Sequence, residues 1–393
     1  MKMLSNVVSA LYRRATQITL FFLIAAIGVL ITSAKTASAV EVKLFEDNYK
    51  MKFYGFVNAV AMYDSKGAKG IDWAFASKNS GDEDSALEFN ADNSRFGFLL
   101  TGNKENDVPG SGLAEFDFVS RKSGNTLRIR HLYADLNAAD WHMLIGQTVS
   151  MLGNLGPSTI NTTWLWGQGN PYNLLTMLRL SRNFGDLGFN LAAVQQGGMG
   201  DIIGDGEIKS NQPNLQANLT FKKGSLAGGL GGNIGRVRVK ASDGTKTNVT
   251  SSLVAAEASV AIPAGAGNSI SLTGKAFTGS GGGLGTGAGQ FAVIDASNEA
   301  HAIKSSGGFV DLGFDIGKTH IHGIAGVDNP KDKVENVTVT RTKNQTVIGN
   351  ISYDLTKAIN IGLEYQQVKT KITGSSEETD MNNRVLASVY YNW

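Results

Sequence analysis

The stretch "RVLASVYYNW", residues 384–393, decides the fold expected for this chain. Its hydrophobic residues recur at every second position: Val385, Ala387, Val389, Tyr391 and Trp393. Alternate side chains of a strand share one face of a sheet. The stretch therefore predicts a β-strand whose aromatic end is buried or in lipid, where a soluble domain would more often fray into a polar tail.

The same period of two runs through the rest of the chain. In "NLQANLTF" (214–221) and "NIGLEYQ" (360–366), apolar residues alternate with polar ones, as in strands with one apolar and one polar face. Sixteen such segments are predicted as strands: 51–63, 93–101, 112–119, 127–136, 140–147, 174–182, 187–195, 213–221, 225–238, 252–262, 269–277, 307–316, 319–327, 345–354, 359–368 and 383–393. The Gly-rich segments 225–238 and 307–316 alternate least clearly.

The connections between these segments begin long, medium, short, short and from there alternate between long and short, so the alternation is nearly strict. The long ones are 64–92, 148–173, 196–212, 239–251, 278–306, 328–344 and 369–382. An even number of strands with sidedness in loop length predicts an all-β fold, a 16-stranded antiparallel transmembrane β-barrel with short periplasmic turns and long extracellular loops. A β-sandwich would give the same alternation but does not need that sidedness, and no fixed-period repeat supports a solenoid.

The first 39 residues have the pattern of a cleaved signal peptide. Basic residues precede an apolar core, "ITLFFLIAAIGVLI" (18–31), and Ala37-Ser38-Ala39 fits the small-x-small cleavage rule. The alternative is an anchored helix, but the core is shorter than the roughly 20 residues that span a bilayer. Residues 1–39 are therefore expected to be removed, leaving 40–393 as one barrel domain of an exported protein.

Charge and composition exclude several function classes. Removing Lys2, Arg13, Arg14 and Lys35 from the 36 basic residues leaves 32 against 34 acidic ones, a net charge of −2, so nucleic acid is not an expected partner. There is no cysteine, so no disulfide stabilises the exported chain. No cofactor and no metal site is expected, because the five histidines do not form a ligand set.

The polar parity of the early strands predicts a charged pore wall. Arginines face the lumen there, and two carboxylates on the third strand lie between them. The members of this wall are Arg95, Glu115, Asp117, Arg128, Arg130 and Arg179. Charged rings in a pore set ion preference, although Arg–carboxylate pairs could also simply brace the wall. Beyond His131 the parity becomes ambiguous, so residues 132–136 receive no assignment.

The long connection 148–173 contains no charged residue and is expected to fold inward and narrow the lumen. Its apolar Met151, Leu152 and Leu165 favour packing against the wall. The residues expected at the constriction, beside the arginines, are Ser158, Thr159, Asn161, Thr162, Thr163, Trp164 and Trp166. The alternative is that Trp164 and Trp166 make an intersubunit or rim contact, since exposed apolar patches often mark interfaces.

Other motifs carry weaker signals. The acidic connection 64–92 could hold a divalent cation but lacks EF-hand spacing, and a solvated acidic loop is the simpler interpretation. The Gly-rich run 279–289 lacks the setting of a dinucleotide site and is expected to be a flexible extracellular loop. His320 with Asp328 or Asp354 keeps a hydrolase open as an alternative.

With the strands placed, the chain resembles the Gram-negative trimeric porins, and is most similar to the DcaP-like branch. The similar stretches are "SRFGF" (94–98), "LRIRHLYADL" (127–136), "IGQTVSML" (145–152), "IGLEY" (361–365) and "SVYYNW" (388–393). The resemblance implies sixteen strands, a homotrimer and passive transport, and it matches Arg95, Arg128 and Arg130 to inward arginines. The ending at Tyr391 and Trp393 resembles the signal recognised for insertion of outer-membrane barrels.

These observations predict a non-enzymatic outer-membrane porin for passive diffusion of small hydrophilic solutes, with anions preferred. Outer-membrane lipid and lipopolysaccharide would surround it. The alternative is a non-channel barrel acting as an adhesin or a hydrolase. A conducting pore would exclude the first, and activity that depends on a His/Asp pair would identify the second.

Overall fold

The computed structural model describes residues 41–44, 48–66, 75, 85–102, 109–119, 127–195, 201–281, 283–331, 333–334, 337–373 and 380–393. The expected signal peptide, 1–39, lies outside the described residues and stays a prediction. Within the described part of the chain, no helix is long and apolar enough to cross a membrane.

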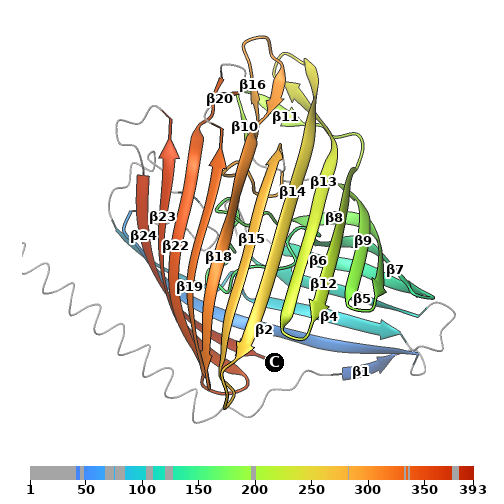
Figure 1. The fold of residues 1–393 in the computed structure, drawn as a ribbon, viewed down its shortest axis with the longest axis vertical. Helices are drawn as coiled ribbons and strands as arrows, with labels where there is room; N and C mark the ends of the chain where they lie inside the picture. Colours follow the sequence, from blue (N-terminus) through green and yellow to red (C-terminus); the bar gives the residue numbers. More distant parts are fainter. Residues whose placement is uncertain are drawn as a thin grey trace, which may run out of the picture.

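Sixteen antiparallel strands form one closed barrel (Figure 1). Its wall consists of β2 (Tyr49–Asp64), β4 (Arg95–Gly102), β5 (Gly110–Asp117), β6 (Arg128–Ala138), β7 (Trp141–Val149), β8 (Leu174–Phe184), β9 (Leu187–Gln195), β12 (Asn214–Lys223), β13 (Leu226–Ala241), β14 (Lys246–Pro263), β15 (Ser269–Ser280), β18 (Lys304–Ile316), β19 (Thr319–Pro330), β22 (Arg341–Asp354), β23 (Ile359–Ile372) and β24 (Asp380–Asn392). Each strand pairs with the next, and β24 pairs back onto β2. The predicted fold class is confirmed, and each predicted segment corresponds to one strand of the wall.

Shorter strands complete the edges of the wall. β1 (Glu41–Leu44) pairs with the first half of β2, and β3 (Ala86–Asn90) pairs with its second half, above β4. β11 (Gly206–Ile208) extends the sheet beside β13. Two small sheets are not hydrogen-bonded into the wall: β10 (Asp201–Ile203), β16 (Gln290–Ile294) and β17 (Ala300–Ala302) form one, and β20 (Lys333–Val334) and β21 (Val337–Thr338) form the other.

The alternation of the sequence places apolar side chains outside and polar side chains inside the barrel. On β12, Leu215 and Leu219 are 53% and 56% exposed on the outer surface, whereas Gln216 and Asn218 are buried inside. A transmembrane barrel has this inverted arrangement because its outer face meets lipid. Each strand of the closed wall is paired on both sides, so the described wall has no open sheet edge, as a membrane requires.

The prediction of a loop over the whole of 239–251 is wrong, because β13 and β14 form a long hairpin that turns only at residues 242–245. These strands have 16 and 18 residues, against eight in β4 and eight in β5, so the wall is taller on one side (Figure 1). Above the expected lipid band the two faces of these strands exchange polarity, with apolar side chains inside and polar ones outside. Val237 and Val249 point inward onto Phe291 while Arg236 is exposed, so the pattern no longer resembles a lipid-facing strand.

The barrel closes where the ends of the described chain meet. The N–H of Trp393 donates to the carbonyl of Gly55 over 3.1 Å, and the N–H of Gly55 donates back over 3.4 Å. Tyr391 is 40% exposed on the outer face, and its ring lies 6.3 Å from that of Trp393. The aromatic edge expected from the sequence is therefore present; its role as an insertion signal stays a prediction.

A tight turn gives the first test of this fold. Gly317, in the two-residue turn between β18 and β19, has a φ of +60°, where an L-residue with a Cβ is strained. We expect Gly317→Val to destabilise the barrel by about 1–2 kcal/mol. Gly323→Val is the matched control, because a Cβ at Gly323 meets nothing within 4 Å. The midpoint of the heat-induced shift in gel mobility measures both, and equal midpoints would contradict the strained turn.

Candidate functional site: the pore lumen

Three neighbouring strands form a network of arginines and carboxylates on the inner wall. Arg128 of β6 makes a two-point contact with Asp117 of β5, with Nε–Oδ1 at 2.8 Å and a second N–O distance of 2.7 Å. Arg130 bridges the two acids, at 2.9 Å from Glu115 and 3.2 Å from Asp117. Because the Asp117 side chain is 0% exposed and that of Arg128 is 30% exposed, the network presents its cations, not its anions, to the lumen.

The network extends to β2 and β4. The Arg95 guanidinium lies 3.9 Å from Glu115, and the Tyr54 hydroxyl donates to the other oxygen of Glu115 over 3.0 Å. Arg95 also stacks over the Phe56 ring at 5.4 Å. The structure thus brings together five of the six wall residues expected from the sequence. It adds Tyr54, whose hydroxyl joins the network although the apolar–polar alternation did not mark this residue as part of the charged wall.

A β-bulge explains the ambiguous parity after His131. The pairing of β5 with β6 shifts register where Glu115 faces His131 and Phe116 faces Ile129. A bulge inserts one extra residue into a strand and so reverses its in–out pattern. His131 contacts Thr148 over 2.9 Å, while Leu132 is 49% exposed on the outer face.

The residues beyond the bulge were missed from the sequence for this reason. Tyr133 and Asp135 follow His131 at alternate positions and take the inward parity. Arg179 of β8, the sixth wall residue, is paired with Leu144 of β7, which is paired in turn with Asp135. In the sector from β4 to β8 the inner wall therefore carries Arg95, Arg128, Arg130 and Arg179 against Glu115, Asp117 and Asp135, a formal balance of 4 − 3 = +1 for this sector. We call the four arginines the arginine wall.

The connection between β7 and β8, residues 150–173, folds inward; we call it the constriction loop. It begins two residues later than predicted because β7 continues to Val149. Acidic side chains of distant strands accept its backbone amides: the Ser158 N–H donates to Asp311 over 2.7 Å, and the Ile160 N–H donates to Glu364 over 2.6 Å. These contacts span more than 150 residues of sequence, so the loop crosses the lumen to the wall formed by β18 and β23.

Further contacts fix both arms of the constriction loop. Lys275 donates to the carbonyl of Leu152 over 2.8 Å and pairs with Glu257 at 3.1 Å. Asn344 donates to Gly167, and Asn350 to Ser158, over 2.7 and 2.8 Å. The sequence places these polar residues on inward parities but contains no signal that links them to the loop, because the contacts depend on barrel closure.

The two tryptophans pack inside the chain. The indole N–H of Trp164 donates to the Pro157 carbonyl over 2.7 Å, and its ring lies 4.9 Å from that of Tyr172. Trp166 is 9% exposed and lies 6.0 Å from the Phe75 ring. These contacts support the inward-folded interpretation and account for both rings without an intersubunit or rim contact.

Some polar residues of the constriction loop are buried where the loop is attached to the wall, and others keep part of their surface exposed. The side-chain amide of Asn161 donates to Glu364, and its oxygen accepts from the Thr163 N–H over 3.0 Å. The side chains of Asn161 and Thr163 are both buried at this attachment of the loop. The Thr159 hydroxyl donates to the carbonyl of Asn161 over 3.0 Å. Thr162 is half-buried. That the loop brings Ser158, Thr159, Thr162 and their neighbours beside the arginine wall stays a prediction.

A second segment, residues 283–303, also folds inward, which corrects the expectation of a flexible extracellular loop at 279–289. Leu284, Ala288 and Phe291 are fully buried. The Tyr172 N–H donates to the Leu284 carbonyl over 2.9 Å, joining this segment to the constriction loop. Its glycines adopt positive φ angles and admit close neighbours such as Trp166, whereas the sequence suggested only flexibility.

The acidic connection 64–92 lies largely outside the described residues. Of its acids, Asp64 forms a buried ion pair with Arg384 at 2.8 Å, and Asp92 accepts from Asn90 over 3.0 Å. The metal-binding alternative there stays a prediction. Elsewhere in the described chain, Asp295, Glu299 and His301 place ligand atoms within 4.8 Å of one another, a grouping the sequence analysis did not find.

The histidine pair considered for a hydrolase is present only in part. His320 lies 3.2 Å from Asp354 and 2.6 Å from Asp315. Asp328 is instead bonded to Ser305 and to the Ala288 N–H. The Ser269 hydroxyl donates to Asp315, not to His320. A nucleophile–base pair needs a hydroxyl at the imidazole, and His320 is positioned here between carboxylates.

The fold and this lumen define a class: the chain has the architecture of the sixteen-stranded outer-membrane porins. Among solved structures it is similar to the outer-membrane channel DcaP of Acinetobacter baumannii, with 21% identity, a TM-score of 0.72, and coverage of 90% of this chain and 99% of that one. This confirms the predicted resemblance at the level of the fold.

Two other outer-membrane protein structures align over nearly their whole length. The anion-selective porin of Comamonas acidovorans shows 12% identity and a TM-score of 0.57, covering 88% of this chain and 100% of that one. OmpT of Vibrio cholerae shows 13% identity and a TM-score of 0.56, covering 90% and 100%. The sequence matches no protein-family model and no curated protein.

Proposed function

We propose that this protein is an outer-membrane porin through which small hydrophilic solutes diffuse passively, with anions preferred. The observation that carries the preference is an asymmetry of exposure. In the network of β4, β5 and β6, the side chains of Arg95, Arg128 and Arg130 keep 26%, 30% and 17% of their area accessible, while those of Glu115 and Asp117 keep 12% and 0%. Asp135, beyond the bulge, keeps 24%.

The carboxylates of the opposite wall that the constriction loop covers do not offset this charge. These carboxylates, Asp311 and Glu364, are 3% and 1% exposed because the amides of the constriction loop cover them. These carboxylate oxygens bind the loop's N–H groups, so they are not in contact with a permeating ion. The lumen therefore leans positive, which favours anions. The anion selectivity of the Comamonas protein, which has the same fold, supports this proposal.

The test is the reversal potential of the refolded protein in a planar bilayer under a KCl gradient. We expect stepwise conductance with a potential of the sign that marks preference for chloride. Preference for potassium would contradict the arginine wall as the selective element. A folded barrel without conductance would contradict the channel itself and favour the adhesin or hydrolase alternative.

A homotrimer is proposed on narrower grounds. The short side of the barrel carries small outward residues at the β2–β24 seam, where Ala59, Ala61 and Ala387 line a hollow of about 330 Å³. Phe89 beside it is 64% exposed. Such a surface admits close packing of a second copy. Light scattering of the detergent-solubilised protein, corrected for bound detergent, should give three chains per particle; a monomer would contradict this assembly.

A further inference from the structure

Three polar side chains of the inner wall have no hydrogen-bond partner inside the described protein. They are Tyr133 and Asp135 of β6 and Arg179 of β8, and we call them the open triad. Among the described residues, the Arg179 guanidinium and the Tyr133 hydroxyl form no hydrogen bond or ion pair. The imidazole of His142 approaches Asp135 only to 3.7 Å, which is too far for a hydrogen bond. All three groups are therefore available to a solute.

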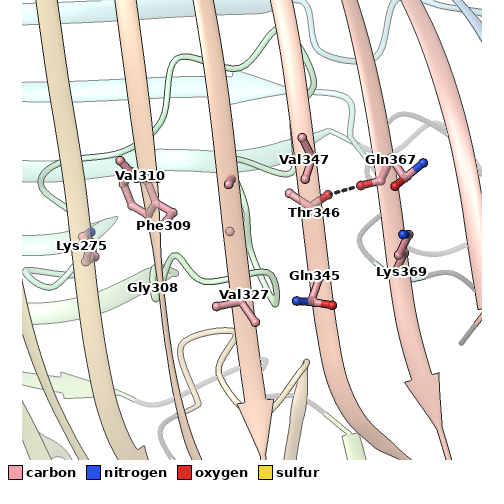
Figure 2. Close-up of a pocket in the computed structure, with 12 residues that line it drawn as sticks. Lys275, Gly308, Phe309, Val310, Val327, Gln345, Thr346, Val347, Gln367 and Lys369 are labelled. Atoms are coloured by element: carbon pink, nitrogen blue, oxygen red, sulfur yellow. Dashed lines mark hydrogen bonds between the residues drawn. The ribbon is translucent and has the colours of Figure 1, made fainter. Parts of the chain in front are cut away.

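A contrast with another inward cation shows what is unusual about Arg179. Lys275, which Figure 2 shows beside Phe309, donates to the Leu152 carbonyl and pairs with Glu257 at 3.1 Å. The Nε of Arg179 is as well covered, yet it has no partner in the part of the chain that the structure describes. Covering a charged group without a partner costs free energy, and the binding of a ligand explains why the wall keeps one.

The backbone holds the two opposite charges of the open triad apart. Asp135 is paired with Leu144 of β7, and Leu144 is paired with Arg179 of β8. Two strand spacings put roughly 10 Å between the Cα atoms of Asp135 and Arg179. Leu144 is 2% exposed and fills the wall between them, and the two charged side chains form no ion pair with each other. A solute that bridges them would satisfy both charges.

The open triad lies between the constriction loop and the periplasmic turns. Leu144 and Tyr133 pack against the hydrophobic cluster that contains Met151 and Leu152 of the constriction loop. β6 reaches its periplasmic turn at Ala138, shortly after Asp135. A solute that has passed the constriction loop therefore meets the open triad before it leaves the channel.

We propose that the open triad binds a zwitterionic solute of the free amino acid class, with its ammonium group on Asp135 and its carboxylate on Arg179. This rests on the proposed porin function and names a solute class for it. The charges identify the ligand: an anion is attracted by Arg179 but repelled by Asp135, a cation the reverse, and a zwitterion satisfies both. The planar fork of Arg179 matches a carboxylate, and the Tyr133 hydroxyl can donate to it or accept from the ammonium group.

The test titrates L-alanine into the refolded full-length barrel in neutral detergent, with binding followed by saturation-transfer NMR. The variant Asp135→Asn/Arg179→Gln removes one acid and one arginine, so the formal balance of the β4–β8 sector stays at +1. The matched control, Asp140→Asn/Arg182→Gln, removes an exposed ion pair of 2.8 Å at the neighbouring periplasmic turn. We expect the dissociation constant of the variant to rise at least about tenfold and that of the control to stay unchanged.

Two analogues of L-alanine assign each charge to its partner. N-acetyl-L-alanine lacks the ammonium group and L-alanine amide lacks the carboxylate, so each should bind the unsubstituted barrel at least about tenfold more weakly than L-alanine. In Asp135→Asn, L-alanine and N-acetyl-L-alanine should bind alike, because the partner of the ammonium group is gone. In Arg179→Gln, L-alanine and its amide should bind alike for the corresponding reason.

Three outcomes would overturn the proposal: equal binding of L-alanine by the double variant, equal loss in the control, or analogues that bind as tightly as L-alanine. Conductance and reversal potential of the double variant are measured in parallel and should be unchanged, because the formal balance of the sector is kept. A conducting barrel that does not bind L-alanine would refute only the open triad. A barrel that binds L-alanine without conducting would refute only the channel.

Discussion

Neutralising Arg128 and Arg130 together should change the pore from anion-preferring to cation-preferring. The double variant Arg128→Gln/Arg130→Gln lowers the formal balance of the β4–β8 sector of the inner wall from +1 to −1, because two cations leave and Glu115, Asp117 and Asp135 remain. It also uncovers Asp117, which loses its two-point partner. We expect the chloride-to-potassium permeability ratio to fall roughly tenfold and the reversal potential to change sign.

Two controls separate charge from structure in that experiment. Arg182→Gln removes an arginine on the same sector of the barrel that faces outward, where it contacts Asp140 at 2.8 Å and the Trp141 ring. Its selectivity should match that of the unsubstituted protein. Arg128→Lys/Arg130→Lys restores the charge without the planar fork and should keep the anion preference. Unchanged selectivity in the neutral double variant would refute the arginine wall, and the pairs would then only brace the barrel.

Releasing the constriction loop should widen the channel. Asp311 and Glu364 accept the amides of Ser158 and Ile160, and Glu364 also accepts from Asn161 and Asn350. The variant Asp311→Ala/Glu364→Ala leaves these donors unpaired and removes the attachment of the loop to the wall. Hydrogen bonds to charged groups contribute about 1.5–3 kcal/mol each, so the attached state loses several kcal/mol.

The expected result is a unitary conductance higher by at least about half and faster entry of larger sugars into proteoliposomes. The control Glu207→Ala/Asp243→Ala removes two exposed carboxylates from the extracellular end and should leave both measurements unchanged. Conductance and size limit equal to those of the unsubstituted protein would show that the loop is held without these two acids.

The fold could be read from the sequence because lipid imposes a strict rule on every strand. Leu215 and Leu219 had to be apolar, and Gln216 and Asn218 could be polar, so the period of two was visible wherever the strand lies in the membrane. The rule ends with the lipid. Above it in the same strand the outward positions carry polar residues such as Arg236 and the inward ones apolar residues such as Val237, and this is why the hairpin of β13 and β14 was mistaken for a loop.

The sequence predicted which residues line the lumen but not which of them contact one another. Parity located Arg95, Glu115, Asp117, Arg128 and Arg130 on the inner wall. It failed at His131, because a single inserted residue reverses the pattern without leaving a mark in composition. It also could not connect Ser158 with Asp311, or Ile160 with Glu364, since those contacts exist only after strands far apart in sequence have closed into one wall.

The closure at the seam has a consequence for how this chain reaches its native state. Asp64 and Arg384 form a fully buried ion pair although 320 residues separate them, and β2 gains its last neighbour only when β24 arrives. Until then a growing sheet keeps two unpaired edges, which invite association with other chains. Contacts between residues so far apart in the sequence form slowly, because the chain must close a long loop before they are made. The Asp64–Arg384 pair can form only when β2 and β24 meet, so it would report closure of the barrel.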